Sequence, residues 1–153
     1  MSKINSATIS DFDGWIELAR EVEPLFGPMA DEPAFHEGLK QAIKSGTAFC
    51  IREEHHATSE LLGGIVIVPK LNDIAWFAVT QKARGKGIGY QLLDYAIRKL
   101  SNKRPITVTT FAPEIESGKP AVNLYKKLGF KQTEPGPVNP AGIETVVMEK
   151  APN

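Results

Sequence analysis

The stretch IAWFAVTQKARGKGIGYQLLDYAIRKL, residues 74–100, decides the fold. Its first part, residues 74–79, is apolar on both alternating faces, which is typical of a central strand covered on both sides. Its last part repeats apolar residues at helical spacing, at Ile88, Leu92, Tyr95, Ala96 and Leu100. The stretch therefore predicts a buried strand, a glycine-rich turn and an amphipathic helix, in that order.

The turn itself reads RGKGIG, residues 84–89. Glycines at alternate positions let the backbone turn tightly and approach a ligand without interference from a Cβ atom. The backbone N–H groups there precede a helix, where unpaired donors and the helix dipole favour an anion. Arg84 and Lys86 add positive charge. We interpret the turn as a binding site for a pyrophosphate group.

Other phosphate-binding loops fit less well. The pattern G-x-x-x-x-G-K-[ST] is absent, and the dinucleotide pattern G-x-G-x-x-G places its third glycine one residue later than this chain does. That pattern also opens a first βαβ unit, whereas this turn lies past the middle of the chain. A nucleotide-binding oxidoreductase is therefore disfavoured. A glycine-rich turn that only connects strand to helix remains the structural alternative.

Strands and helices are expected along the whole chain. Further strands are predicted at residues 3–8, 47–52, 61–68, 105–111, 130–133 and 144–150. Three further helices are predicted: one from a cap at Ser10 and Asp13 to about Pro24, one ending near Lys44 before Gly46, and one over residues 120–128. Strands flanked by helices on both sides give an α/β sandwich.

Length and charge limit the function classes. A chain of 153 residues suits a single domain, residues 1–153, and its 18 basic residues balance 18 acidic ones. This balance argues against wide contact with nucleic acid or membranes. Cys50 is the single cysteine, and no Cys/His cluster has the spacing of a metal site. The N-terminus lacks a secretory signal, so we expect a soluble cytoplasmic protein without metal.

Two segments carry a resemblance to a known family. WFAVTQKARGKGIGYQLLDYAI resembles motif A of the GNAT superfamily of N-acyltransferases, and KPAVNLYKKLGF resembles its motif B. They follow the family's order and cover about residues 74–131. The resemblance implies a mixed, mostly antiparallel sheet of six or seven strands with helices on both faces, whose central strands splay apart around coenzyme A.

The resemblance also implies which residues bind acetyl-CoA as the acyl donor. Backbone amides of the turn would hold the pyrophosphate, from Arg84, Gly85, Lys86, Gly87, Ile88 and Gly89. Main-chain groups of Phe77, Ala78 and Val79 would pair with the pantetheine arm as if it were an added strand. Many motif B segments carry asparagine where this chain has Gly118, so one contact with the cofactor is missing here.

Two side chains are candidates for acid–base chemistry. An amine must lose a proton before it can attack a thioester, and the leaving thiolate is helped by a proton donor. Tyr125 matches the motif B tyrosine that serves as this donor, although it also lies on the apolar face of its helix. Asp73 begins the central strand, on the predicted face of Phe77 and Val79, where several family members place a glutamate base. Its shorter side chain would need a water relay.

The resemblance indicates where the amine acceptor binds but not which amine it is. The first two helices and their joining loop usually line the acceptor pocket in this fold, so Glu23, Phe26 and Met29 are candidates for substrate binding, and packing is the alternative for each. The resemblance implies transfer of an acetyl group to a primary amine, on a small molecule or peptide, in a ternary complex. A non-catalytic acyl-CoA-binding or sensing module is the alternative. A homodimer, common in the family, stays open.

Overall fold

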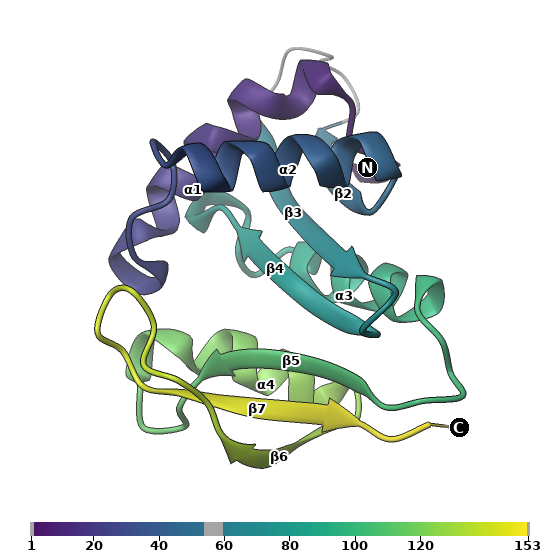
Figure 1. The fold of residues 1–153 in the computed structure, drawn as a ribbon, viewed down its shortest axis with the longest axis vertical. Coiled ribbons are helices and arrows are strands. Elements are labelled where there is room, and N and C mark those ends of the chain that lie inside the picture. Colours follow the sequence, from purple (N-terminus) through teal and green to yellow (C-terminus); the bar gives the residue numbers. More distant parts are fainter. Residues whose placement is uncertain (1, 54–59, 153) are drawn as a thin grey trace.

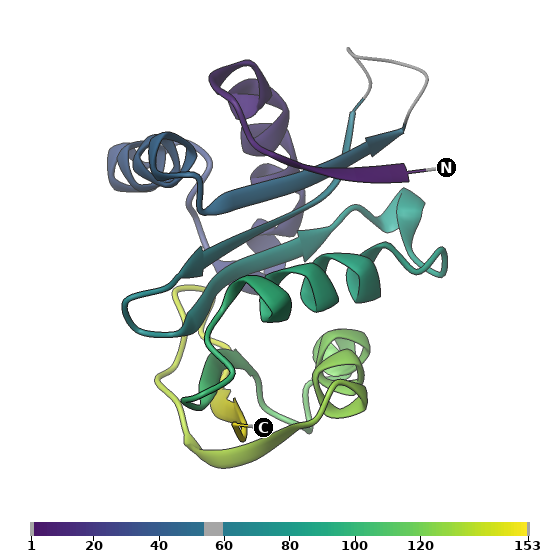
Figure 2. The same ribbon diagram turned by 90° about the vertical axis from the view of Figure 1, so that its right-hand side faces the viewer.

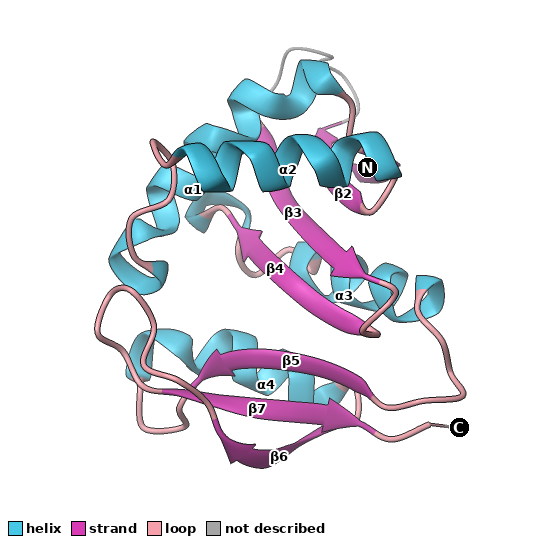
Figure 3. Ribbon diagram, viewed as in Figure 1, coloured by secondary structure: helices cyan, strands magenta, loops and turns pink. Residues whose placement is uncertain are grey.

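The computed structural model describes residues 2–53 and 60–152. A seven-stranded sheet has the order β1-β2-β3-β4-β5-β7-β6. The strands are β1 (Ser2–Ser6), β2 (Ala48–Glu53), β3 (Leu61–Val68), β4 (Asp73–Val79), β5 (Ile106–Phe111), β6 (Phe130–Pro135) and β7 (Thr145–Lys150). Within this sheet β4 and β5 pair in parallel and the other neighbouring pairs are antiparallel, which confirms the predicted mixed sheet (Figure 3).

In residues 2–53 and 60–152, four α-helices cover the sheet on its two faces. They are α1 (Phe12–Phe26), α2 (Pro33–Ser45), α3 (Ile88–Lys99) and α4 (Lys119–Lys127). Helices α1 and α2 lie over one face of the β2–β4 half, and α3 lies on the opposite face with α4 beside it (Figure 2). Two hydrophobic cores result, one around Trp15 and Leu18 beneath α1 and α2, the other around Leu92 and Met148. No helix in the described ranges is long and apolar enough to cross a membrane.

Both ends of α1 differ from the prediction. The capping box is formed by Thr8 and Asp11, not by Ser10 and Asp13, and it caps a 3₁₀ turn, Ile9–Asp11, that precedes α1: the Thr8 N–H donates to Asp11 Oδ2 at 2.8 Å. The helix also continues past Pro24 to Phe26, because the Gly27 N–H still donates to the Glu23 carbonyl. Proline removes one hydrogen bond here without ending the last turn.

The sheet splits in its middle. Strands β4 and β5 pair only at Asp73↔Thr107 and Ile74↔Val108, and beyond these residues they diverge (Figure 1). The splay expected from the family resemblance is confirmed. Because the two strands diverge, Ala75 is exposed although it lies on the central strand β4. The prediction that β4 is covered on both sides is therefore wrong at this residue.

A β-bulge at Ala75 changes which side chains of β4 face the cleft. Val66 of β3 pairs with Trp76 and Ile67 with Ile74, so Ala75 has no partner opposite it. Ile74 packs in the core beneath α3, as Phe77 does, whereas Trp76 packs beneath α1 and α2. By alternation Asp73 lies on the face opposite Phe77. The prediction that the two share a face is wrong, since an extra residue reverses the alternation.

Asn72 fixes the point where the two halves of the sheet separate. It is 1% exposed, with a left-handed backbone (φ 53°), and its side-chain amide donates to the carbonyls of Ser101, Arg104 and Pro105. Its Oδ1 accepts from the Ser101 N–H at 2.8 Å. The turn before β4 is thereby tied to the segment before β5, next to the short parallel pairing.

Candidate active site

A cavity of about 550 Å³ runs from the glycine-rich turn into the splay between β4 and β5. Its lining includes Gly85, Gly87 and Gly89 at one end and Phe77 and Ala121 further in. A second cavity of about 180 Å³ continues between the strands and shares Phe77 and Ala121 with the first. The two cavities form one cleft that leads from the turn to the middle of the sheet.

The turn presents free hydrogen-bond donors at the mouth of this cleft. The first backbone hydrogen bond of α3 runs from the Gln91 N–H to the Gly87 carbonyl. The N–H groups of residues 85–90 donate to no acceptor in the described part of the chain. Arg84 is the one charged residue among those lining the larger cavity, and Lys86 is exposed beside it. Such a concentration of donors and positive charge fits a phosphorylated ligand.

The three glycines of the turn serve two purposes. Gly85 and Gly87 have φ values of 82° and 78°, a left-handed conformation that favours glycine. Gly89 instead lies inside α3, where a Cβ atom would meet Leu124 Cδ1 at 2.9 Å and Phe77 Cζ at 3.3 Å. Gly85 and Gly87 can therefore let the backbone approach a ligand closely, as the sequence predicts, whereas Gly89 has a packing role. Gly89 allows α3 to pack closely on α4 and β4.

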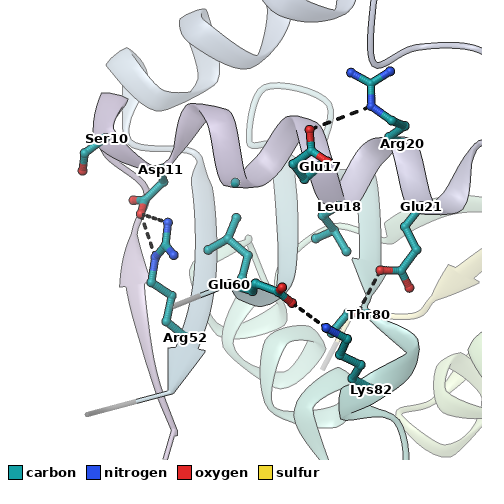
Figure 4. A pocket seen from close by; sticks show the side chains of 12 residues that line it. Ser10, Asp11, Glu17, Leu18, Arg20, Glu21, Arg52, Glu60, Thr80 and Lys82 are labelled. Atoms are coloured by element: carbon teal, nitrogen blue, oxygen red, sulfur yellow. Dashed lines mark hydrogen bonds and ion pairs between the residues drawn. The ribbon is translucent and has the colours of Figure 1, made fainter. Parts of the chain in front are cut away.

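Glu21 of α1 braces the segment that leads into the turn. Its Oε1 accepts from the Thr80 hydroxyl at 2.8 Å (Figure 4). Its Oε2 accepts from the Gln81 N–H, also at 2.8 Å. Sequence reasoning missed this role, since a glutamate on an exposed helix position carries no local signal of a partner 60 residues away. The pocket drawn in Figure 4 holds charges that are largely paired with one another, including Lys82 with Glu60 at 3.1 Å.

Tyr125 of α4 lines the smaller cavity. Its ring packs against Phe77 and Phe130, with centroids 6.1 and 5.5 Å away, and the residue is 3% exposed. Its hydroxyl forms no hydrogen bond with the described residues. Burial, with a smaller contribution from the charge of Asp73, raises the pKa of Tyr125. The hydroxyl therefore keeps its proton at neutral pH and is available to a ligand in the cleft.

Asp73 lies beside the cleft rather than in its lining. Ile74 and Ala75 line the smaller cavity, and Asp73 precedes them. Its Oδ1 accepts from the Thr107 hydroxyl at 2.6 Å. Burial raises the pKa of the Asp73 carboxyl, and the Thr107 hydrogen bond opposes this shift.

The three candidates for acceptor binding lie in different surroundings. Phe26 lines both cavities and bridges the splay, with ring centroids 5.9 Å from Trp76 and 5.8 Å from Phe111. Met29 is buried, and its Sδ accepts from the Trp76 indole N–H at 3.3 Å. Glu23 binds the N–H groups of Met29 and Ala30, which lower its pKa, so its carboxylate holds the α1–α2 loop.

The departure from motif B at Gly118 has a steric cause. A Cβ atom at Gly118 would collide with the Phe111 ring, which lies against the glycine. An asparagine could therefore not occupy this position while Phe111 packs on Phe26. The C-terminal loop closes the same end of the cleft, where Asn139 lines the smaller cavity and its Nδ2 donates to the Leu25 carbonyl at 2.8 Å.

Neither the cysteine nor a group of metal ligands adds to the candidate active site in the described residues. Burial raises the pKa of the Cys50 thiol to about 12, so this cysteine stays protonated and fits the core residue expected from the sequence. Among residues 2–53 and 60–152, no three His, Cys, Asp or Glu side chains are grouped as ligands of a metal ion.

Solved structures show the same fold. An acetyltransferase of the GNAT family from Bacillus cereus matches with a TM-score of 0.73 and 16% identity, covering 100% of this chain and 99% of its own. PaiA N-acetyltransferase from Thermoplasma acidophilum, in complex with coenzyme A, matches at 0.73 and 20% identity, covering 99% of each chain. The ribosomal-protein-S18-alanine N-acetyltransferase from Escherichia coli matches at 0.67 and 15% identity, covering 98% of this chain and 93% of its own.

Sequence comparison gives a family as well as a fold. No curated protein sequence matches the chain. The family model described as an acetyltransferase (GNAT) domain matches residues 28–152, a span that includes both motifs and the entire cleft side of β4, β5, α3 and α4. The resemblance seen in the sequence is confirmed: the chain belongs to the GNAT family of acetyltransferases.

Proposed function

We propose that the chain is an acetyl-CoA-dependent N-acetyltransferase that moves an acetyl group to a primary amine in a ternary complex. The observation that carries this proposal is the set of free N–H groups at residues 85–90, placed where the cleft between β4 and β5 opens. The start of any helix leaves about four N–H groups unpaired, and here the set extends back to residue 85 and lies beside a cavity of about 550 Å³.

The residues present fit coenzyme A. The N–H groups of residues 85–90, with Arg84, would hold the pyrophosphate. No acidic residue lines the larger cavity, in the part of the chain that the structure describes, so nothing there repels an anion. Beyond Ile74 the edge of β4 that faces β5 has no strand partner. Main-chain groups of Phe77 and Val79 would pair with the pantetheine arm along this edge, whereas Ala78, between them, pairs with Gly64 of β3.

Bound there, acetyl-CoA supplies an acetyl group on a thioester. Tyr125 would hold its proton at Oη for the departing sulfur, since its raised pKa keeps it protonated and its hydroxyl lacks a partner among the described residues. A main-chain N–H near Val79 would donate to the thioester oxygen. Phe26 and Phe111 would keep the cleft apolar and limit the entry of water.

Asp73 would take the proton that the amine must lose. An aliphatic ammonium has a pKa of about 10.4, so removal of its proton needs an acceptor. Among the described residues Asp73 Oδ2 has no hydrogen-bond partner, while Oδ1 is held by Thr107. Burial raises the pKa of this carboxyl, which makes it a better proton acceptor than an exposed aspartate. A bridging water would complete the path.

Ligand-dependent stabilisation tests the proposal. Acetyl-CoA at 100 times its dissociation constant should raise the free energy of unfolding by about 2.7 kcal/mol. NAD at the same concentration should leave the melting temperature unchanged. Stabilisation by NAD and not by acetyl-CoA would favour the oxidoreductase alternative. Stabilisation by acetyl-CoA without turnover of any amine would favour the non-catalytic module.

A further inference from the structure

An apolar groove of about 570 Å³ lies on the α1–α2 face of the sheet, between α2 and the β3–β4 hairpin. Helix α2 contributes Phe35, Gly38 and Ala42, and the hairpin contributes Val66 and Val68. The volume is in the range that holds a small molecule.

The groove is continuous with the candidate active site. Ala75 and Trp76 line both the groove and the smaller cavity in which Tyr125 lies. The bulge at Ala75 makes this junction, because the residue has no partner on β3 and is exposed at the point where β5 diverges. A molecule in the groove would therefore reach the reacting atoms from the side opposite the glycine-rich turn.

The wall of the groove is aromatic and held in place. The Trp76 ring lies 5.5 Å from Trp15 and 6.2 Å from Phe35, measured between centroids. The Trp76 indole N–H donates to Met29 Sδ at 3.3 Å, which fixes the ring plane. Aromatic walls of this kind bury apolar and aromatic groups well.

The charges of the groove exclude one class of amine. No Asp or Glu is among the described residues that line it, and Lys70, in the turn between β3 and β4, is the one charged member. A second ammonium group further along the groove would find no carboxylate among the described lining residues and would be repelled by Lys70. Polyamines are therefore poor occupants.

Polar side chains that line the groove already form hydrogen bonds within the protein. Gln41 Nε2 donates to Ser45 Oγ at 3.2 Å, and the Thr47 hydroxyl donates to the Ala42 carbonyl at 3.3 Å. An extended peptide would bring an N–H and a C=O group with each residue, more than the few free donors and acceptors on Gln41, Ser45 and Thr47 can pair with. A compact apolar molecule fits better.

We infer that the acceptor is a small primary amine with an apolar aromatic or branched body and no second positive charge, and that this groove holds the body. The inference rests on the proposed function and adds the substrate class to it. Burial of the apolar body would supply binding energy, while the amine lies near Ala75, at the mouth of the cavity that contains Tyr125.

Gly38 offers a clean test of the groove. A Cβ atom there meets nothing within 4 Å, so the backbone has room for a side chain, and Gly38→Leu should extend into the groove and favour the helix. Glu37→Leu adds the same side chain to the same helix at an exposed position outside the groove and serves as the matched control.

Rates of acetylation are measured with 2-phenylethylamine, ethylamine, spermidine and a short peptide with N-terminal leucine. We expect kcat/KM to be at least about tenfold higher for 2-phenylethylamine than for the other three. The ratio of 2-phenylethylamine to ethylamine should fall about tenfold in Gly38→Leu and stay unchanged in Glu37→Leu. A preference for spermidine or the peptide, or a ratio that does not fall in Gly38→Leu, would overturn the inference while leaving acetyl transfer intact.

Two further outcomes separate the remaining explanations. If Gly38→Leu impairs transfer from hexanoyl-CoA and leaves transfer from acetyl-CoA to 2-phenylethylamine unimpaired, the groove holds a longer acyl chain and the inference is wrong. If no amine is acetylated although the protein is folded, the proposed function fails and the inference fails with it.

Discussion

The Thr107 hydroxyl donates a hydrogen bond of 2.6 Å to Asp73 Oδ1, across the short parallel pairing that joins β4 to β5. This bond lies where the two halves of the sheet separate. It holds one carboxylate oxygen and leaves Oδ2 without a partner in the described residues. The candidate base is therefore anchored to both strands that form the cleft.

Replacing Asp73 tests this role. Asp73→Asn can still accept the Thr107 hydrogen bond through its amide oxygen, but it cannot take a proton. We expect kcat to fall by about 10²-fold or more, with little change in the dissociation constant of acetyl-CoA. Thr107→Val, which removes the hydrogen bond and keeps the carboxylate, is the control and should reduce kcat less. Full activity of Asp73→Asn would show that another group accepts the proton that the amine loses.

The same variant should change stability in a pH-dependent way. The folded-state pKa of Asp73 is raised by burial, so the favourable contribution of its proton is present below the unfolded pKa and is lost as pH rises through the folded pKa. Asp73→Asn cannot ionise and should be more stable than the parent at about pH 7, with the difference shrinking near pH 4. Urea unfolding at the two pH values measures this. A difference that grows on acidification would contradict the burial argument.

Tyr125→Phe separates a proton donor from a packing residue. The substitution keeps the ring against Phe77 and Phe130 and removes a hydroxyl that has no partner among the described residues. We expect kcat to fall by about 10²–10⁴-fold with an almost unchanged melting temperature. Tyr95→Phe on α3, whose ring packs on Phe49, is the matched control for loss of a tyrosine hydroxyl outside the cleft. Undiminished turnover in Tyr125→Phe would show that its hydroxyl is idle.

Gly87 tests the charge preference of the turn. Asp and Asn both tolerate a positive φ better than other side chains, so Gly87→Asp and Gly87→Asn should strain the backbone similarly. Only the aspartate brings a negative charge to the predicted pyrophosphate site. We expect the dissociation constant of coenzyme A to be at least about tenfold higher in Gly87→Asp than in Gly87→Asn, which is about 1.4 kcal/mol. Equal affinities, measured by calorimetry, would place the anion elsewhere.

Glu21→Gln should weaken acetyl-CoA binding from a distance. Glutamine keeps one acceptor oxygen, so it can no longer bind the Thr80 hydroxyl and the Gln81 N–H with two oxygens. A loss of about 1 kcal/mol corresponds to about a fivefold higher dissociation constant. Glu17→Gln, whose carboxylate makes an exposed contact of 3.9 Å with Arg20, is the control on the same helix. The same affinity in both variants would show that the Glu21 contacts do not position the turn.

Local patterns predicted much of the fold and the turn. The helix boundary at Gly46 and the strand Leu61–Val68 follow from residue type and spacing alone, and both are found. The tight turn at residues 84–87 likewise was predicted from its glycines, and Gly85 and Gly87 have positive φ there. These features depend on neighbours in the sequence, which is why the sequence reveals them.

Features that depend on distant partners could not be predicted in this way. The bulge at Ala75 arises from pairing with β3, and it reversed the face expected for Asp73. Glu23 is a predicted acceptor contact, and its Oε2 accepts from two N–H groups of the α1–α2 loop, whereas the nearby Glu21 braces the turn, a role that was not predicted. Both glutamates lie on one helix, and their roles differ only through tertiary contacts that no local pattern encodes.

Acetyl transfer to an amine can be measured by following both of its products. The protein is incubated with acetyl-CoA and a series of primary amines, and the free thiol and the acetylated amine are quantified by absorbance and mass spectrometry. We predict that both products rise in equal amounts, at rates that depend on the amine and fall in Tyr125→Phe. Thiol release without acetylated amine, or binding of acetyl-CoA with neither product, would contradict the account.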